Sequence, residues 1–421
     1  VSLPIISSSV MPKTPVLTSM GYVVGNTLGG GVLALPSVSL PSGLGPSTIA
    51  LFVTWVGCVA TGLLIAEVVL NINDHNDGNN AGGEKSTSIM DMAEQTLGKP
   101  AGVASCAIFV LLNYSFLLAY MCKSGEVLDQ LFRSISLVSS NGMLQQIHPF
   151  SVLYALLIGG AVLVGHKGDA EINLLDTIQN LLMGVLFLSF GTMLAGLLPA
   201  AELSDWVRSD PSAVPSAMPM LVCALVFHNV IPSVVTQQDR NPSRIRTAII
   251  GGSLVPVIMY VLFNAAVVGA IPTGDTTTLV EQVSSALGPL ALALPIFSMT
   301  TLTASILGIA TSQVDEFSAL MPTCITSQNT ESMLGTSLTF LPPLAAACVL
   351  TGPGTFEAVL EFGGTFGCLT LFGIIPCAMV WRQRESAMPG IELLPGGTAA
   401  LTVVAGASLA LIASYSTALL T

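Results

Sequence analysis

The stretch Gly25-Asn26-Thr27-Leu28-Gly29-Gly30-Gly31-Val32-Leu33-Ala34-Leu35-Pro36 lies inside a long apolar run, where a helix is expected. Four of its first seven residues are glycine, and each glycine inside a helix costs about 1 kcal/mol relative to alanine. Membrane helices accept this weakness where the freed backbone is buried in protein or lines a cavity. We therefore interpret the stretch as a break in a membrane-spanning helix. The alternative is tight helix packing, which small residues also mark.

Composition sets the class of protein. The chain has 421 residues, of which 52% are hydrophobic and 9% charged, whereas soluble domains carry about 25% charged residues. Few charges and long apolar runs predict an all-α polytopic membrane protein embedded in a lipid bilayer. The net charge of −12 argues against nucleic acid as a partner.

No pattern of residues indicates an enzyme. The eight cysteines fall mostly inside apolar runs and have no zinc-ligand spacing. The sequence also has no nucleophile elbow and no phosphate-binding loop. We therefore expect no catalytic residue, no metal site and no cofactor, and any energy for transport would come from an ion gradient.

Eleven stretches are long and apolar enough to be candidate membrane spans. They lie near residues 18–40, 47–70, 100–122, 149–165, 175–199, 218–237, 246–271, 290–320, 333–350, 355–381 and 398–419. Two shorter amphipathic patterns predict helices over 88–97 and 276–287 in the connecting loops.

The basic residues predict the orientation of these spans. Loops on one side hold nine of the twelve basic residues: Lys13, Lys85, Lys99, Lys167, Arg240, Arg244, Arg246, Arg382 and Arg384. Loops on the other side hold the remaining three: Lys123, Arg133 and Arg208. This bias places the N-terminus on the cytoplasmic side, or on the equivalent side of an organelle. The membrane is then a plasma membrane or an organelle membrane, such as that of a plastid.

The two halves of the chain share a plan. Span six carries a second polar interruption, Phe227-His228-Asn229-Val230-Ile231-Pro232, at the position that the glycine-rich break has in span one. Matching breaks are typical of an inverted repeat with its binding site between them. We expect an N-terminal tail at 1–17, five-helix repeats at 18–199 and 218–381, and an additional helix at 398–419.

The first break offers groups suited to a zwitterion. Asn26 and Thr27 supply polar side chains, and Gly29, Gly30 and Gly31 leave peptide groups bare. The carboxylate of an amino acid could bind N–H groups at the start of the following half-helix, where the helix dipole favours negative charge. Exposed carbonyl groups could accept an ammonium group or a cation.

Other candidate residues lie in the remaining spans. His228 could relay a proton or bind the substrate, or it could simply bond a carbonyl freed by Pro232. Glu67 could be a buried ion site or an interfacial capping residue. Ser305, on a polar face of span eight, could bind a cation, although hydroxyls often bond their own helix. Asn113 could line the binding pocket, and Phe227 could cover it.

Four segments carry a resemblance to a known family. They are residues 24–36, residues 227–233 (Phe227-His228-Asn229-Val230-Ile231-Pro232-Ser233), Ile306–Ala310 and Thr339–Leu344. In these segments the chain resembles the hydroxy/aromatic amino acid permeases, especially the tyrosine- and tryptophan-type permeases of the amino acid–polyamine–cation superfamily. The resemblance extends over nearly all of residues 18–384.

The resemblance implies eleven helices in the leucine-transporter fold, with a five-plus-five inverted repeat and with helices 1 and 6 discontinuous. It implies proton-driven uptake of aromatic amino acids such as tyrosine or tryptophan. By position, Gly25 to Gly31 would hold the backbone groups of the substrate, and Phe227 to Asn229 would form part of the pocket. Some relatives have a basic residue in span five that replaces a sodium ion, whereas residues 181–198 here contain no lysine or arginine.

The sequence therefore leaves the coupling ion open between a proton at His228 or Glu67 and a sodium ion between spans one and eight, near Ser305. Two rival functions remain at this stage. One is transport of another small neutral amino acid or amine by the same fold. The other is a channel or sensor, which the absence of a filter sequence disfavours.

Overall fold

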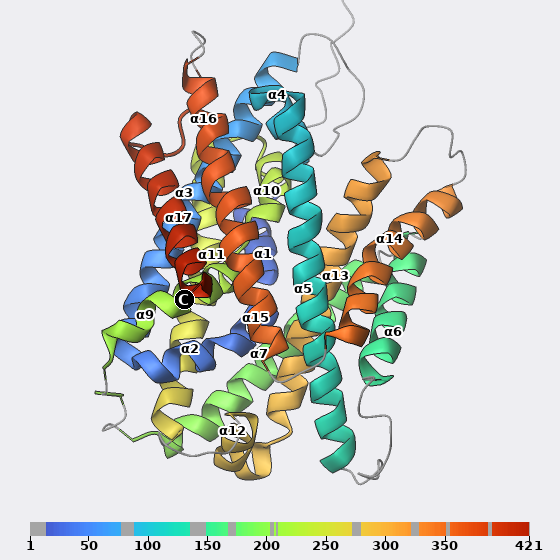
Figure 1. The fold of residues 1–421 in the computed structure, drawn as a ribbon, viewed down its shortest axis with the longest axis vertical. Coiled ribbons are helices and arrows are strands. Elements are labelled where there is room, and N and C mark those ends of the chain that lie inside the picture. The colour runs from blue at the N-terminus through green and yellow to red at the C-terminus, as the bar shows by residue number, and fades with distance from the viewer. Residues whose placement is uncertain are drawn as a thin grey trace, which may run out of the picture.

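The computed structural model describes residues 14–76, 88–134, 149–166, 174–202, 206–207, 209–271, 279–320, 328–350, 354–385 and 390–420. Every regular element in these ranges is helical (Figure 1). Most of the expected N-terminal tail and the basic residues Lys13, Lys85, Lys167 and Arg208 lie outside them.

The first half of the chain supplies the helices up to residue 200. They are α1 (Val16–Thr27), η1 (Gly30–Ala34), α2 (Leu35–Ser42), α3 (Leu44–Asn76), α4 (Ile89–Leu97), α5 (Lys99–Ser134), α6 (Pro149–His166), α7 (Leu174–Leu197) and η3 (Leu198–Ala200).

The second half repeats this plan and adds one helix. Its elements are η4 (Pro211–Ala213), α9 (Val214–Ala224), η5 (His228–Val230), α10 (Ile231–Gln237), α11 (Pro242–Ala270), α12 (Leu279–Leu287), η6 (Gly288–Leu290), α13 (Ala293–Leu320), α14 (Gln328–Val349), α15 (Thr355–Phe362), η7 (Gly363–Ile374), α16 (Ile375–Glu385) and α17 (Gly397–Leu420).

The described helices give a polytopic membrane protein, but the exact count of eleven spans is not confirmed. Nine helices are long and apolar enough to cross a membrane, or ten when α1 is joined to Gly30–Ser42 across a bend of 46°. The predicted span 149–165 corresponds to α6, within which Val152–Val164 is counted as a shorter apolar helix.

The short loop helix α4 (Ile89–Leu97) matches the amphipathic helix predicted over 88–97 and is capped at its start. The hydroxyl of Ser88 accepts a hydrogen bond from the N–H of Asp91, and the Asp91 carboxylate accepts one from the N–H of Ser88. This reciprocal pair satisfies two donors that the helix itself leaves free. Figure 1 shows α4 and α12 at opposite ends of the bundle, as expected for loop helices on opposite sides of the membrane.

The contacts between helices follow the pattern expected of two similar five-helix units. Helix α5 packs on α6 as α13 packs on α14, and α7 packs on α13 as α15 packs on α5. The pairs α3–α11, α5–α13 and α6–α14 join equivalent helices of the two units. The repeat boundaries at 18–199 and 218–381 stay a prediction that this pairing supports.

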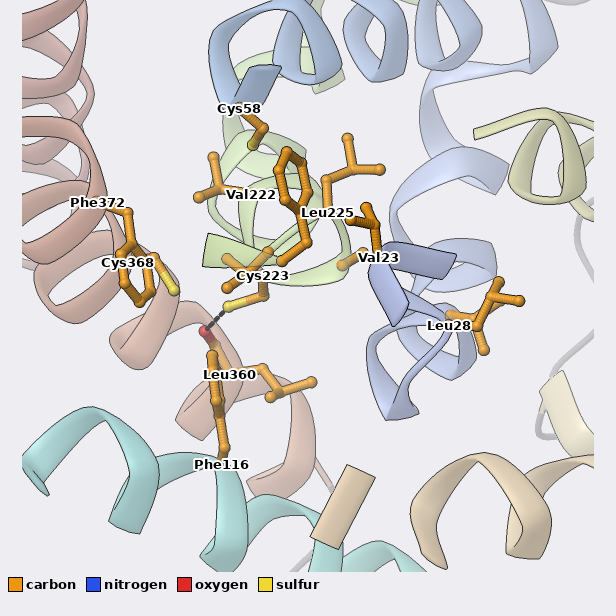
Figure 2. Packing of buried hydrophobic residues seen from close by; sticks show 14 of the residues in the cluster. Val23, Leu28, Cys58, Phe116, Val222, Cys223, Leu225, Leu360, Cys368 and Phe372 are labelled. Carbon is orange, nitrogen blue, oxygen red and sulfur yellow. Dashed lines mark hydrogen bonds between the residues drawn. The ribbon is translucent and has the colours of Figure 1, made fainter. Parts of the chain in front are cut away.

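One span contains a feature that the sequence analysis missed. Between α15 and α16 the backbone forms a π-helix over Gly363–Ile374. Its glycines let neighbouring helices approach closely, since a Cβ on Gly364 would lie 2.4 Å from the carbonyl oxygen of Pro219 in α9. In Figure 2 the thiol of Cys223 points at the carbonyl oxygen of Leu360, at 3.0 Å. The π-helix and its flanks thus pack directly against the helix that precedes the second break.

Candidate functional site

The first break is narrower than predicted. Gly25, Asn26 and Thr27 remain in α1, and the helix ends at Leu28, whose ψ is 71°. Gly29 is extended, and the chain then enters η1 and α2. The hydroxyl of Thr27 donates back to the carbonyl of Val23 at 2.7 Å, so this side chain is engaged by its own helix. The peptide groups outside the α-helix are therefore those after Thr27, and among them the N–H of Gly29 donates to the carbonyl of Thr27 at 2.8 Å.

The second break also differs from its predicted bounds. Helix α9 ends at Ala224, and the backbone leaves helical geometry over Leu225–Phe227 before η5 begins at His228. Pro232 lies in the first turn of α10 and opens that helix, because a proline at this position loses no hydrogen bond. The predicted break at 227–232 thus begins two residues earlier.

The two breaks touch. A Cβ on Gly31 would lie 2.8 Å from the Cα of Ala224, which is too short a distance for a real Cβ atom. The amide of Asn26 also reaches toward the carbonyl oxygen of Val226, at 3.5 Å. Because these two segments lie so close together, both interpretations that the sequence left open hold for the glycines: they break the helix and they allow tight packing.

Tyr260 of α11 joins the ends of both broken helices. Its hydroxyl lies 2.7 Å from the carbonyl oxygen of Thr27, at the end of α1, and 3.1 Å from that of Ala224, at the end of α9. The side chain is fully buried. Sequence analysis missed this residue, although a tyrosine deep within an apolar span, far from the interface that tyrosines usually prefer, was a signal.

Helices α5 and α13 close over the first break. The N–H of Gly30 donates to the hydroxyl of Ser305 at 2.8 Å, and that hydroxyl donates to the carbonyl of Thr301 at 2.9 Å. On the other side, a Cβ on Gly30 would lie 2.6 Å from the ring of Tyr120. The predicted residue Ser305 is thus brought to the break.

His228 is buried behind the second break. Its ring stacks between Phe227 and Phe372 of the π-helix, with ring centres 5.0 and 4.7 Å away. Its Nε2 lies 2.7 Å from the hydroxyl of Thr61, which itself donates to the carbonyl of Cys58. When the Thr61 hydroxyl donates to its own helix, Nε2 carries the proton and Nδ1 is an acceptor; Nδ1 has no partner among the described residues. The bond to Thr61 replaces the predicted bond to a carbonyl freed by Pro232.

Phe227 packs into the core instead of forming a free lid. Its side chain is fully buried, and a Cβ on Gly62 of α3 would lie 2.9 Å from its ring. The neighbouring Asn229 is half-buried in η5. The ring that faces the first break is that of Tyr120, which stacks on Phe116 with centres 6.0 Å apart.

Two other predicted residues pair away from the breaks. The amide of Asn113 donates to the side-chain oxygen of Gln313 at 2.7 Å, joining α5 to α13. Glu67 is fully buried and accepts hydrogen bonds from Arg384 and from the backbone N–H of Leu393. A polar cavity of about 240 Å³ adjoins this pair. Neither residue is brought to the junction of the two breaks.

Similarity to known proteins, in sequence and in fold, agrees with this geometry of two interrupted spans in contact. The model of the tryptophan/tyrosine permease family matches residues 13–414. The chain belongs to the tryptophan/tyrosine permease family. The predicted family is thereby confirmed, and this permease is a multi-pass membrane protein of a transport family.

Curated relatives cover nearly the whole of this permease. The tyrosine-specific transport system 1 of Haemophilus influenzae is 24% identical over 91% of this chain and 92% of its own. The tryptophan-specific transport protein of the same organism is 23% identical, covering 89% and 90%. The glutamine transporter 2 of Aliivibrio fischeri is 25% identical, covering 86% and 87%.

A solved structure has the same fold. The crystal structure of MhsT in complex with L-phenylalanine aligns with a TM-score of 0.60 and 13% identity, covering 94% of this permease and 96% of that chain. The predicted all-α, leucine-transporter-like fold with discontinuous helices 1 and 6 is confirmed.

Proposed function

We propose that this permease is a secondary active transporter that takes up aromatic amino acids such as tyrosine or tryptophan together with a proton, by alternating access. The observation that carries the proposal is the contact between Gly31 of η1 and Ala224, the last residue of α9, where the two interrupted spans meet. Names of relatives that refer to tyrosine and tryptophan transport support the choice of substrate.

The peptide groups after Thr27 would bind the backbone of the substrate. Gly29 and Gly31 lie at the start of η1, which leads into α2. The positive end of a helix dipole favours a carboxylate there. The C-terminal carbonyls of α1 and α9, which include the two that accept from Tyr260, carry the negative ends of the helix dipoles and would favour the ammonium group. Gly25 and Asn26, in the last turn of α1, would flank this group.

The ring of the substrate would bind beside Tyr120. This side chain approaches Gly30 from α5 and continues into Phe116 and Phe356, whose ring centre lies 6.4 Å from that of Tyr120. Aromatic rings pair favourably at such distances. The proposal therefore assigns ring recognition to α5, with Phe227 supporting the second break from behind.

His228 is the favoured site for the coupled proton. Its Nδ1 is a buried acceptor with no partner among the described residues, and buried ionisable groups within membranes are commonly functional. Glu67, by contrast, is held by the guanidinium of Arg384 and by backbone donors. Its carboxylate is better suited to a fixed structural charge than to the uptake and release of a proton.

A second candidate function is transport of another small neutral amino acid, with sodium as the alternative co-ion. The likeness to a protein named as a glutamine transporter favours keeping this candidate. Ser305, which already contacts the first break, would then bind the sodium ion.

The test is uptake into vesicles that contain the purified permease, using radiolabelled tyrosine and tryptophan with proton and sodium gradients imposed separately. We expect accumulation above the external concentration with the proton gradient alone. Competition by unlabelled glutamine stronger than that by tyrosine would support the second candidate. The absence of uptake of either aromatic amino acid under both gradients would contradict the main proposal.

A further inference from the structure

The hydroxyl of Tyr260 lies where two helix ends meet. It faces the carbonyl of Thr27, the last residue of α1, and that of Ala224, the last residue of α9, at 2.7 and 3.1 Å. A tyrosine hydroxyl has one hydrogen to donate, so the two carbonyls share it. One side chain of a third helix therefore bonds both broken spans at the points where they stop being helical.

This position is electrostatically demanding. Carbonyl groups at the end of a helix lack intrahelical partners and carry the negative end of the helix dipole. Two such ends directed at one buried point require a positive group or a hydrogen-bond donor. The Tyr260 hydroxyl is the donor shared by both carbonyls, from a side chain with no solvent-exposed surface; the carbonyl of Thr27 also accepts from the N–H of Gly29 at 2.8 Å.

The helix that carries Tyr260 is itself firmly packed on α1. A Cβ on Gly252 of α11 would lie 2.7 Å from the Cβ of Val23 and 2.9 Å from the carbonyl oxygen of Met20. Helix α11 thus contacts α1 along its length as well as at its end. The hydroxyl is therefore supported by a fixed surface and not by a mobile loop.

We propose that Tyr260 is a positioning residue whose hydroxyl sets the spacing between the two breaks, so that the peptide groups that bind the substrate are held in place before it arrives. This inference rests on the proposed function, because it assigns the substrate to these peptide groups.

The experiment compares Tyr260→Phe with Tyr114→Phe. Tyr114 donates to the carbonyl of Leu338 at 2.7 Å and joins α5 to α14, away from both breaks, so the control loses the same group at the same distance. A third protein carries 4-aminophenylalanine at position 260, which restores a donor on the same ring. Each purified protein is measured for tyrosine binding, for thermal stability without substrate, and for hydrogen–deuterium exchange of residues 25–31 and 224–230.

We expect Tyr260→Phe to weaken tyrosine binding about tenfold, because a shared buried hydrogen bond is lost, and to accelerate exchange at both breaks together. Tyr114→Phe should leave binding and exchange at the breaks unchanged, and 4-aminophenylalanine should restore both. Unchanged exchange at either break in Tyr260→Phe would overturn the inference, as would equal effects of the two phenylalanine variants. Exchange is measured without substrate, so failure of the unmodified protein to bind any aromatic amino acid would count against the proposed function separately.

Discussion

Glu67 and Arg384 form a buried, two-pronged ion pair between α3 and α16. The Nε and Nη2 atoms of Arg384 donate to the two carboxylate oxygens at 2.8 and 2.9 Å. The backbone N–H of Leu393 donates to the same carboxylate at 2.9 Å, and Arg384 also donates to the carbonyl of Leu394. The pair therefore fixes the segment between α16 and α17 onto the end of α3.

Replacing one partner of this pair should destabilise the protein strongly. Glu67→Gln would remove the buried carboxylate and leave Arg384 only the exposed Glu392, at 3.9 Å, as a counter-charge; breaking a buried pair costs about 3–5 kcal/mol. The matched control is Glu385→Gln, which removes the exposed partner of Arg382 at 3.5 Å and should cost about 0–1 kcal/mol. Thermal unfolding in detergent measures both changes. Equal melting temperatures for the two variants would show that the buried pair contributes no more than the exposed one.

Gly31→Ala should abolish transport, because its Cβ would lie 2.8 Å from the Cα of Ala224 and would force the two breaks apart. Gly21→Ala is the control in the neighbouring α1, where a Cβ would meet no atom within 4 Å. That control should keep full uptake and gain up to about 1 kcal/mol of stability from helix propensity. The measurement is initial uptake rate normalised to the amount of folded protein in the membrane. If Gly31→Ala retained normal uptake, the close contact between the breaks would not be needed for function.

Ser305→Ala should weaken uptake by loosening the first break. The N–H of Gly30 would lose its acceptor, and an unsatisfied buried donor costs about 1–3 kcal/mol. Ser312→Ala serves as the control on the same helix, since its hydroxyl bonds the carbonyl of Gly308 in its own helix. Uptake should fall in the first variant and stay near normal in the second. A dependence on sodium that disappears with Ser305→Ala would favour the second candidate function.

His228→Asn should reduce proton-driven uptake about tenfold or more by removing the buried acceptor Nδ1 together with the hydrogen bond to Thr61. Thr61→Val removes only the partner of Nε2 and keeps the imidazole. Proton-driven accumulation should therefore survive in Thr61→Val and be lost in His228→Asn, where exchange of labelled for unlabelled substrate can continue. Retention of full proton-driven accumulation without the imidazole would rule out His228 as the coupling residue.

Much of the architecture was predictable because its signals are local. Runs of apolar residues predicted the spans, the amphipathic pattern over 88–97 predicted α4, and the glycines near Gly30 marked the first break. The bounds of the breaks were less accurate. Thr27 stays in α1 with its hydroxyl bonded to the carbonyl of Val23, an outcome that composition alone does not decide.

The candidate site was predicted only in part, because its contacts join distant positions. Asn113 pairs with Gln313, 200 residues away, and Glu67 pairs with Arg384, 317 residues away. Residue type showed that Asn113 and Glu67 needed partners inside the membrane, but it could not say which partners. Tyr260 was missed for the same reason, since its importance depends on the convergence of Thr27 and Ala224.

The sequence by itself determined a helical membrane protein with two interrupted spans, because hydropathy and backbone propensity act within a few residues. Only the tertiary structure decided which groups meet at the interruptions, and it places Glu67 and Asn113 elsewhere, paired with Arg384 and Gln313. The physical reason is that a buried polar group must find a partner wherever packing brings one. That partner depends on how distant helices cross, which no local pattern of residues records.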